Sequence, residues 1–107
     1  MNIEKLEAML AKGQDSSLLR MGLAQAYLDA DQVADAISHL LKCLELDADY
    51  TAAWKLLGKA RLAAGDIQGA RQDWQRGLAV SQRRGDRQAE KEIGVFLRRL
   101  DKQFPSE

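Results

Sequence analysis

Apolar residues recur along this chain at intervals of three and four positions, which is the period of one face of an α-helix. Short polar or glycine-containing segments divide the pattern into stripes at 3–10, 19–27, 33–44, 54–62, 67–80 and 89–100. No run of Val, Ile, Thr and aromatic residues alternates with polar residues for more than a few positions, so strands are not indicated. The pattern predicts an all-α protein of about six helices.

A shift of the sequence by 34 residues aligns positions 17–50 with positions 51–84. All of the identical pairs are Leu or Ala, and most recur at helical spacing, which is what shared packing produces. The pairs are Leu23/Leu57, Ala26/Ala60, Leu28/Leu62, Ala30/Ala64, Ala36/Ala70 and Leu44/Leu78. The chain therefore contains two copies of one unit, and each copy holds two of the predicted helices.

Residues between the stripes are typical of helix ends. Gly65 can adopt the left-handed conformation that ends a helix, and the side chain of Asp66 can cap the next one. The first copy has Asp31 and Gln32 there, a poorer junction because positive φ strains a residue other than glycine. Caps and stops expected elsewhere are Gly13, Ser16 or Ser17, Asp49 or Thr51, and Gly85 with Asp86.

The repeated unit resembles the tetratricopeptide repeat, which has 34 residues and the consensus W-x2-L-G-x2-Y, then A-x3-F, then P. The second copy matches this pattern at Trp54, Leu57, Gly58, Ala70 and Trp74, and departs from it at Arg61 and Gln82. The first copy matches at Leu23, Ala24, Tyr27, Ala36 and Leu40, and departs from it at Arg20 and Ala48. Small residues such as Ala24 and Gly58 would let paired helices approach closely, while Leu40 and Trp74 would fill the space between units.

The resemblance implies a short right-handed solenoid of antiparallel helix–turn–helix units. We expect a single domain over residues 1–107, in which two full units are flanked by two half-units. Residues 1–13 would form an N-terminal half-unit helix, 17–50 and 51–84 the two repeats, and 86–101 a C-terminal capping helix. The capping helix continues the register of the repeats if one residue is inserted near positions 83–85.

Composition supports a globular protein and indicates a compartment. No apolar stretch approaches the roughly 18 residues of a membrane span, and the N-terminal segment is polar and acidic, unlike a secretory signal. The single cysteine, Cys43, cannot form an intramolecular disulfide, which fits a reducing compartment. We therefore expect a cytoplasmic protein that does not contact membranes.

Charge is distributed unevenly although the formal net charge is zero. Residues 1–50 hold 4 Lys and Arg against 9 Asp and Glu, whereas residues 51–107 hold 12 against 7. This polarity could steer a charged partner or promote head-to-tail self-association. Chance combined with the charge preferences of helix ends is the simpler explanation.

The sequence contains no clear catalytic or metal-binding constellation. His39 and Cys43 could share a helix face, but a structural metal site usually needs four ligands and a second pair is missing. Asp29, Asp31 and Asp35 resemble the start of a calcium loop without its glycine and its final glutamate. We expect neither enzymatic activity nor a cofactor.

Nucleic-acid binding is a weaker alternative. Arg71, Arg76, Arg83, Arg84 and Arg87 gather in the C-terminal half, with Trp74 between them. The sequence pI of about 6.6 is low for a phosphate-binding domain, and Trp74 occupies a predicted core position, so it would not stack on bases. No nucleic-acid partner is expected.

The family resemblance implies that the first helix of each unit lines a concave surface that holds a peptide or helix of a partner protein. By position, this surface would present Leu18, Met21, Gln25, Leu28, Lys55, Lys59 and Leu62. Lys55 and Lys59 share a helix face and could together meet an acidic side chain or a C-terminal carboxylate, although a solvated face explains them equally well. The sequence thus favours a non-catalytic protein-interaction module with a protein or peptide partner.

Two other possibilities follow from the same resemblance. Some family members hold the C-terminal carboxylate of chaperones with a clamp of Lys, Asn and Arg, but Met21 and Leu56 stand where that clamp needs Lys and Asn, so we do not expect this activity. A two-repeat surface is shallow, so the chain could instead be a homo-oligomeric assembly module.

Overall fold

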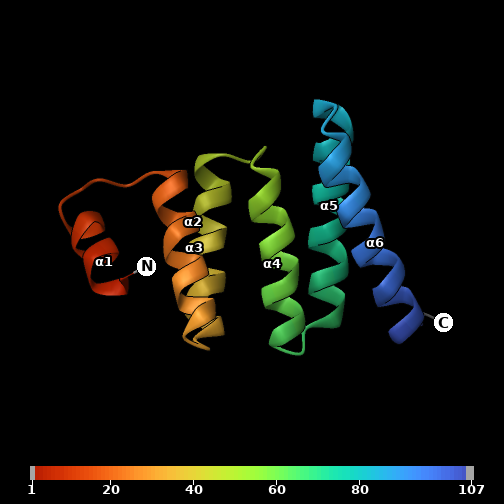
Figure 1. Cartoon of the computed structure of the whole chain (residues 1–107), viewed down its shortest axis with the longest axis horizontal. Helices are drawn as coiled ribbons and strands as arrows, with labels where there is room; N and C mark the ends of the chain where they lie inside the picture. The colour runs from red at the N-terminus through yellow and green to blue at the C-terminus, as the bar shows by residue number, and fades with distance from the viewer. Residues whose placement is uncertain (1, 106–107) are drawn as a thin grey trace.

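The computed structural model describes residues 2–105 and contains six α-helices arranged in chain order along the longest axis of the molecule (Figure 1). The helices are α1 (Ile3–Ala11), α2 (Ser17–Asp29), α3 (Val33–Leu46), α4 (Thr51–Ala63), α5 (Ile67–Arg84) and α6 (Arg87–Gln103). The prediction of an all-α fold is confirmed, and residues 2–105 contain no strand. None of the helices within this range is long and apolar enough to cross a membrane.

Most contacts between helices join neighbours in the sequence. The most extensive contacts are between α2 and α3 and between α4 and α5, which we call the first and second hairpins. The two hairpins pack together through α3 and α4. Helix α1 packs on α2 at one end, and α6 packs on α5 and also contacts α4 at the other end. This dependence on nearest neighbours gives an elongated molecule of 46 × 30 × 19 Å, as expected for a helical repeat.

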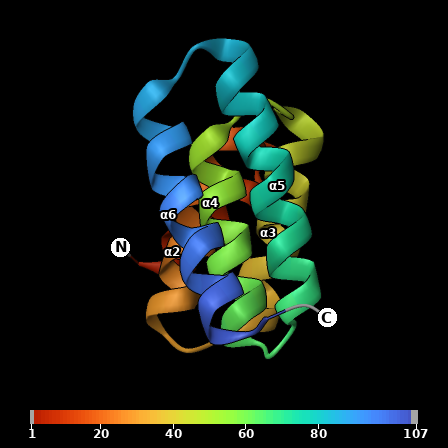
Figure 2. The same ribbon diagram turned by 90° about the vertical axis from the view of Figure 1, so that its right-hand side faces the viewer.

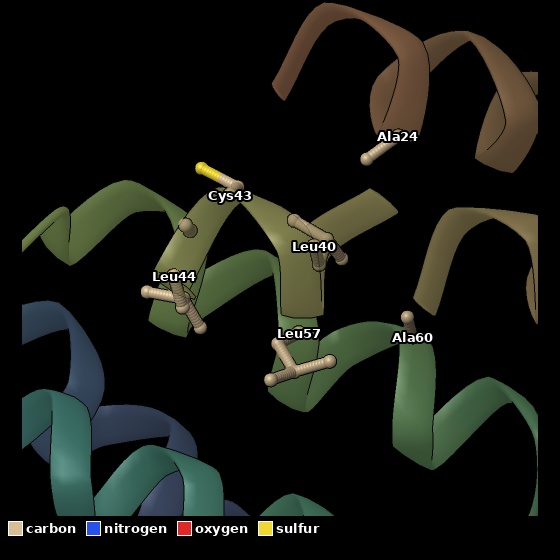
Figure 3. Packing of buried hydrophobic residues seen from close by; sticks show 7 residues of the cluster. Ala24, Leu40, Cys43, Leu44, Leu57 and Ala60 are labelled. Carbon is tan, nitrogen blue, oxygen red and sulfur yellow. The ribbon is translucent and has the colours of Figure 1, made fainter. Parts of the chain in front are cut away.

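The centre of the core lies where the two hairpins meet. The first helix of each hairpin, α2 or α4, is called its first-position helix, and the second, α3 or α5, its second-position helix. Leu40 of α3 is completely buried between two small residues of the first-position helices, Ala24 of α2 and Ala60 of α4 (Figure 3). Leu57 and Cys43 belong to the same cluster and are also fully buried. The predicted alternation of small and large residues is therefore what allows close helix packing here.

The second hairpin uses the same arrangement with different residues. A Cβ added at Gly58 of α4 would overlap the indole ring of Trp74 from α5, so only glycine leaves room for this contact. The indole N–H of Trp74 donates a 3.0 Å hydrogen bond to the carbonyl oxygen of Lys55. Gly58 and Trp74 thus correspond to Ala24 and Leu40 of the first hairpin, as their 34-residue spacing indicates.

Helix junctions follow the sequence in most places. Gly65 has φ 82° and the carboxylate of Asp66 accepts a 2.8 Å hydrogen bond from the backbone N–H of Gly69, whereas Asp31 is held at φ 59° and Gln32 makes no side-chain cap. Ser16 caps α2 as expected. The expectation for α4 was wrong, because its N-cap is Tyr50 without a side-chain cap. The other two candidates bind elsewhere: Asp49 accepts from Arg83, and Thr51 donates to Asp86.

The N-terminal helix is fastened by a polar network beside its apolar contacts. Leu6 of α1 packs against Leu19 and Leu23 of α2. The imidazole of His39 on α3 stacks on Tyr27, and its Nε2 lies 3.4 Å from the Glu7 carboxylate of α1. Arg20 lies 3.0 Å from Nδ1 of the same ring, and since a guanidinium can only donate, Nδ1 is the acceptor.

The register of α6 differs from the expected one. The N-cap residues Ser16 and Tyr50 are 34 positions apart, but Tyr50 and Asp86 are 36 positions apart, so the insertion is two residues and not one. Helix α5 causes this offset because it has 18 residues against 14 in α3 and is followed by a shorter junction. With this spacing, Ile93 and Gly94 of α6 correspond to Leu57 and Gly58 of α4.

Candidate partner-binding surface

The predicted surface begins on α2, whose four named residues differ in how available they are. Leu18 is 72% exposed, the highest exposure of any large apolar side chain within residues 2–105. Met21 and Leu28 are half-buried against the central core, so only part of each side chain can meet a partner. Gln25 is exposed and donates a 3.1 Å hydrogen bond to Asp29. Helix α2 therefore offers a mixed apolar and polar strip.

Lys55 of α4 is bound within the molecule. Its ammonium donates a 2.6 Å hydrogen bond to the carboxylate of Glu92 on α6, which also accepts one from Gln88. The hydrogen bond from Lys55 is the main reason that the pKa of Glu92 is lowered from its ordinary value. Lys55 thus joins α4 to α6.

Lys59, one turn further along α4, also faces α6. Its ammonium lies 4.9 Å from the ring centroid of Phe96, which is within the range of a cation–π interaction. The side chain remains exposed to solvent. The two lysines share a helix face, as their spacing predicts, but Lys55 is paired with a carboxylate while Lys59 lies above an aromatic ring and keeps its charge accessible.

Helices α4, α5 and α6 lie together at the C-terminal end of the molecule (Figure 2). A pocket of about 300 Å³ opens beside Lys59 and is lined by residues of these three helices. Its apolar surface comes from Leu62 of α4, Trp74 of α5 and Phe96 of α6. The ring centroids of Trp74 and Phe96 are 5.3 Å apart. Lys59 and Arg99, both exposed, supply positive charge. An apolar side chain next to a carboxylate is the chemistry that such a pocket can hold.

The structure therefore brings Lys59 and Leu62 together with residues that sequence reasoning missed. Phe96 and Arg99 were assigned only to a capping helix, and Trp74 only to the core. The register of α6 was the available signal: with the correct spacing, α6 is a first-position helix like α2 and α4, so its side chains extend the same surface.

Cys43 is held as a protonated thiol, which is a poor nucleophile. Burial raises the pKa of the Cys43 thiol to about 11, and Asp47 adds to this effect. The thiol donates a 3.3 Å hydrogen bond to the carbonyl oxygen of Ser17. His39 instead interacts with Arg20 and Tyr27. Cys43 and His39 therefore contact different partners. Within residues 2–105, no group of three or more His, Cys, Asp or Glu side chains is arranged to hold a metal ion.

Several arginines of the C-terminal half have partners inside the molecule. Arg71 forms an ion pair with Asp101 and donates to the carbonyl oxygen of Phe104. Arg83 donates to the Asp49 carboxylate at 2.6 Å, and Arg84 donates to the Asp49 carbonyl oxygen. These contacts use donors that phosphate binding would require, and Trp74 is only 3% exposed, so it is closed to base stacking.

Comparison with known proteins identifies the family. A tetratricopeptide repeat model matches residues 17–60. The TPR repeat-containing protein PA0015 of Pseudomonas aeruginosa is 60% identical over 102 residues, which cover 95% of this chain and 97% of that protein. The chain belongs to the tetratricopeptide repeat family.

Solved structures of other proteins share its architecture. Protein BPP2914 from Bordetella parapertussis is 48% identical, with a TM-score of 0.85 over 96% of this chain and 90% of that one. A tetratricopeptide repeat domain protein from Salinibacter ruber, 20% identical, has a TM-score of 0.81 over 87% and 94% of the two chains. The first TPR of Spaghetti (RPAP3), bound to the HSP90 peptide SRMEEVD, is 23% identical and has a TM-score of 0.73 over 96% and 90%. The last two establish similarity of fold alone.

Proposed function

We propose that this tetratricopeptide repeat protein is a non-catalytic interaction module that binds a peptide or helix of a partner protein. Domains of this family generally mediate protein–protein interactions and are typically non-catalytic. The binding surface runs from α2 across α4 to α6. One observation carries the proposal: Lys59 and Leu62, which the family resemblance implied, line a pocket together with Phe96 and Arg99 of α6.

The chemistry of this pocket defines the kind of segment that it accepts. An apolar side chain would pack on Leu62 and Phe96, above the nearly buried ring of Trp74, and a carboxylate beside it would bind Lys59 and Arg99. The peptide bound by the TPR of Spaghetti combines the same two features, since the sequence SRMEEVD contains Met and Val as well as three acidic residues. Because Met21 and Leu56 stand at clamp positions that require Lys and Asn, the proposal is an acidic, partly apolar segment in general and not this chaperone peptide.

Lys55 has a positioning role in this proposal. Its hydrogen bond to Glu92 sets α6 against α4, so reversal of its charge would disturb the pocket indirectly. A variant that changes both Lys55 and Lys59 would therefore mix two effects. Lys59→Glu with Arg99→Glu is the better test because both side chains are exposed and neither forms an ion pair within residues 2–105.

The test is affinity capture from a lysate of the source organism with three immobilised proteins. These are the wild type, Lys59→Glu with Arg99→Glu, and a control, Lys42→Glu with Arg76→Glu, which makes the same change of charge at exposed, corresponding positions of α3 and α5. We expect the wild type and the control to retain a protein from the lysate that the pocket variant does not retain. Equal retention by all three proteins would contradict it, and retention of this chain alone would favour self-assembly.

A further inference from the structure

A second, larger groove lies between α5 and α6 at the C-terminal end of the stack. Figure 2 shows these two helices nearest the viewer. Its volume is about 1110 Å³, and it shares no lining residue with the pocket beside Lys59. Leu78 and Gln82 of α5 line one side, and Arg87, Lys91, Gly94 and Arg98 of α6 line the other.

The two hairpins reveal what a groove of this kind normally holds. In each hairpin the second helix places a large side chain over a small residue of the first, Leu40 over Ala24 and Trp74 over Gly58. Gly94 is the residue of α6 that corresponds to Gly58, but no second helix follows α6 within residues 2–105. A Cβ added at Gly94 would meet only the end of the Arg98 side chain, at 3.4 Å, so the position above it is open.

Charge along the groove restricts what can occupy it. Arg87, Lys91, Gly94 and Arg98 follow the spacing of a single helical stripe, so three cations flank the open position at Gly94. One carboxylate, that of Glu90, also lines the groove, where it accepts a 3.2 Å hydrogen bond from Gln82. All three cations are exposed, and none takes part in an ion pair within the described part of the chain. A helix seated in this groove would therefore be stabilised by acidic side chains along its edge.

We propose that the α5–α6 groove binds an acidic amphipathic helix of a partner protein. The helix places a bulky apolar residue over Gly94, as Trp74 does over Gly58, and its Asp or Glu side chains pair with Arg87, Lys91 and Arg98. It acts as the missing second helix of a third unit. This site is separate from the concave pocket and does not depend on it.

A second copy of this chain is a poorer occupant. Helix α1 is the one helix that takes a second-position register without a first-position partner, since Leu6 lies 34 residues before Leu40. The residue of α1 that corresponds to Trp74 is Leu6, which is already buried against Leu19 and Leu23 of its own chain. The exposed charges of α1 are mixed, Glu4 with Lys5 and Lys12, so this helix would bring neither a free bulky residue at that position nor an acidic edge. The groove is therefore better matched to a different, acidic protein.

The experiment uses the full chain and a synthetic helical probe. The probe is a fluorescent 18-residue peptide that copies Ile67–Arg84, the segment that covers Gly58, with Arg71→Glu, Arg76→Glu, Arg83→Glu and Arg84→Glu to make it acidic. Fluorescence anisotropy measures its affinity for the wild type and for two groove variants. Gly94→Leu fills the open position, and Arg87→Glu with Lys91→Glu and Arg98→Glu reverses the charge. Lys42→Glu with Arg76→Glu is the control, because it reverses two exposed charges that line neither the groove nor the pocket. Lys59→Glu with Arg99→Glu is measured beside it to report binding at the concave pocket, and circular dichroism establishes that each variant is folded.

We expect saturable binding that each groove variant weakens by about tenfold or more, while the control binds like the wild type. Gly94→Leu would block the position of the bulky residue, and the triple variant would turn several exposed charge pairs into repulsive ones. No saturable binding to the wild type would overturn the proposal, and so would binding that neither groove variant changes. Binding reduced only by the Lys59 and Arg99 variant would also overturn it, while supporting the concave surface as the place where acidic helices bind.

Discussion

Trp74 of α5 lies across Gly58 of α4, and its indole ring occupies the space that a side chain at position 58 would need. The ring is 3% exposed, and its N–H is tied to the carbonyl oxygen of Lys55, one turn earlier in α4. The indole also forms part of the wall of the pocket beside Lys59. One contact therefore sets both the packing of the second hairpin and the shape of the candidate binding site.

Replacement of Gly58 by alanine is expected to destabilise the protein. Alanine is the better helix former, but its methyl group would displace a buried ring, and such overpacking typically costs about 1–3 kcal/mol. Urea unfolding measures the free energy. Gly94→Ala is the control, because that position is open and the same change should raise stability by about 0.5–1 kcal/mol. Equal effects at the two positions would show that the indole does not restrict Gly58.

Asp31 is expected to be a point where the first hairpin can be improved. It is the single non-glycine residue at positive φ within residues 2–105, and Gly65 stands at the same position in the second hairpin. Asp31→Gly should therefore raise the free energy of unfolding by up to about 1 kcal/mol, and Gly65→Ala should lower it by about 1 kcal/mol. Thermal and urea unfolding of both variants test this pair; a less stable Asp31→Gly protein would mean that the aspartate side chain stabilises the turn.

The stability of the folded protein should decrease as the pH is lowered through about 6.5, the ordinary pKa of histidine. Burial, with a smaller contribution from Arg20, lowers the pKa of His39 in the folded protein. The unfolded chain then binds a proton that the folded chain does not, so protonation favours unfolding in this range. The measurement is the urea midpoint between pH 7.5 and pH 5.5 for the wild type and for His39→Gln. A decrease of the same size in both proteins would assign the effect to other groups.

Cys43 should react slowly with thiol reagents while the protein is folded. The increase in its pKa from 9.0 to about 11 lowers the thiolate fraction near pH 8 about 100-fold, and burial adds a steric barrier. A disulfide-exchange assay with and without 6 M urea measures the ratio of rates. Fast reaction of the folded protein, at a rate close to that in urea, would mean that α2 and α3 open readily.

The sequence predicted the fold well wherever a residue's role depends on near neighbours. The stripes identified all of the helices, and the junctions at Gly65 with Asp66 and at Gly85 with Asp86 were confirmed, because helix ends depend on a few consecutive residues. The cap of α4 was missed because Asp49 binds Arg83, which is 34 residues away. Sequence alone does not reveal such a competing partner.

The candidate site was predicted only in part, for a similar reason. The family resemblance implied Lys59 and Leu62 as surface residues, but their neighbours Phe96 and Arg99 lie beyond the point where the repeat length changes from 34 to 36. The pairing of Lys55 with Glu92 joins residues 37 positions apart, so no local pattern indicates it. The residues that α6 contributes to the site could be identified only from the three-dimensional arrangement of the last three helices.

The most direct test of the central claim is a two-dimensional NMR titration of the full chain with the partner segment obtained by affinity capture. We expect the backbone amide shifts to concentrate in α4 and α6, around Lys59, Leu62, Phe96 and Arg99, with smaller changes along the exposed side of α2. Shifts confined to the outer sides of α3 and α5, with the pocket residues unchanged, would contradict it.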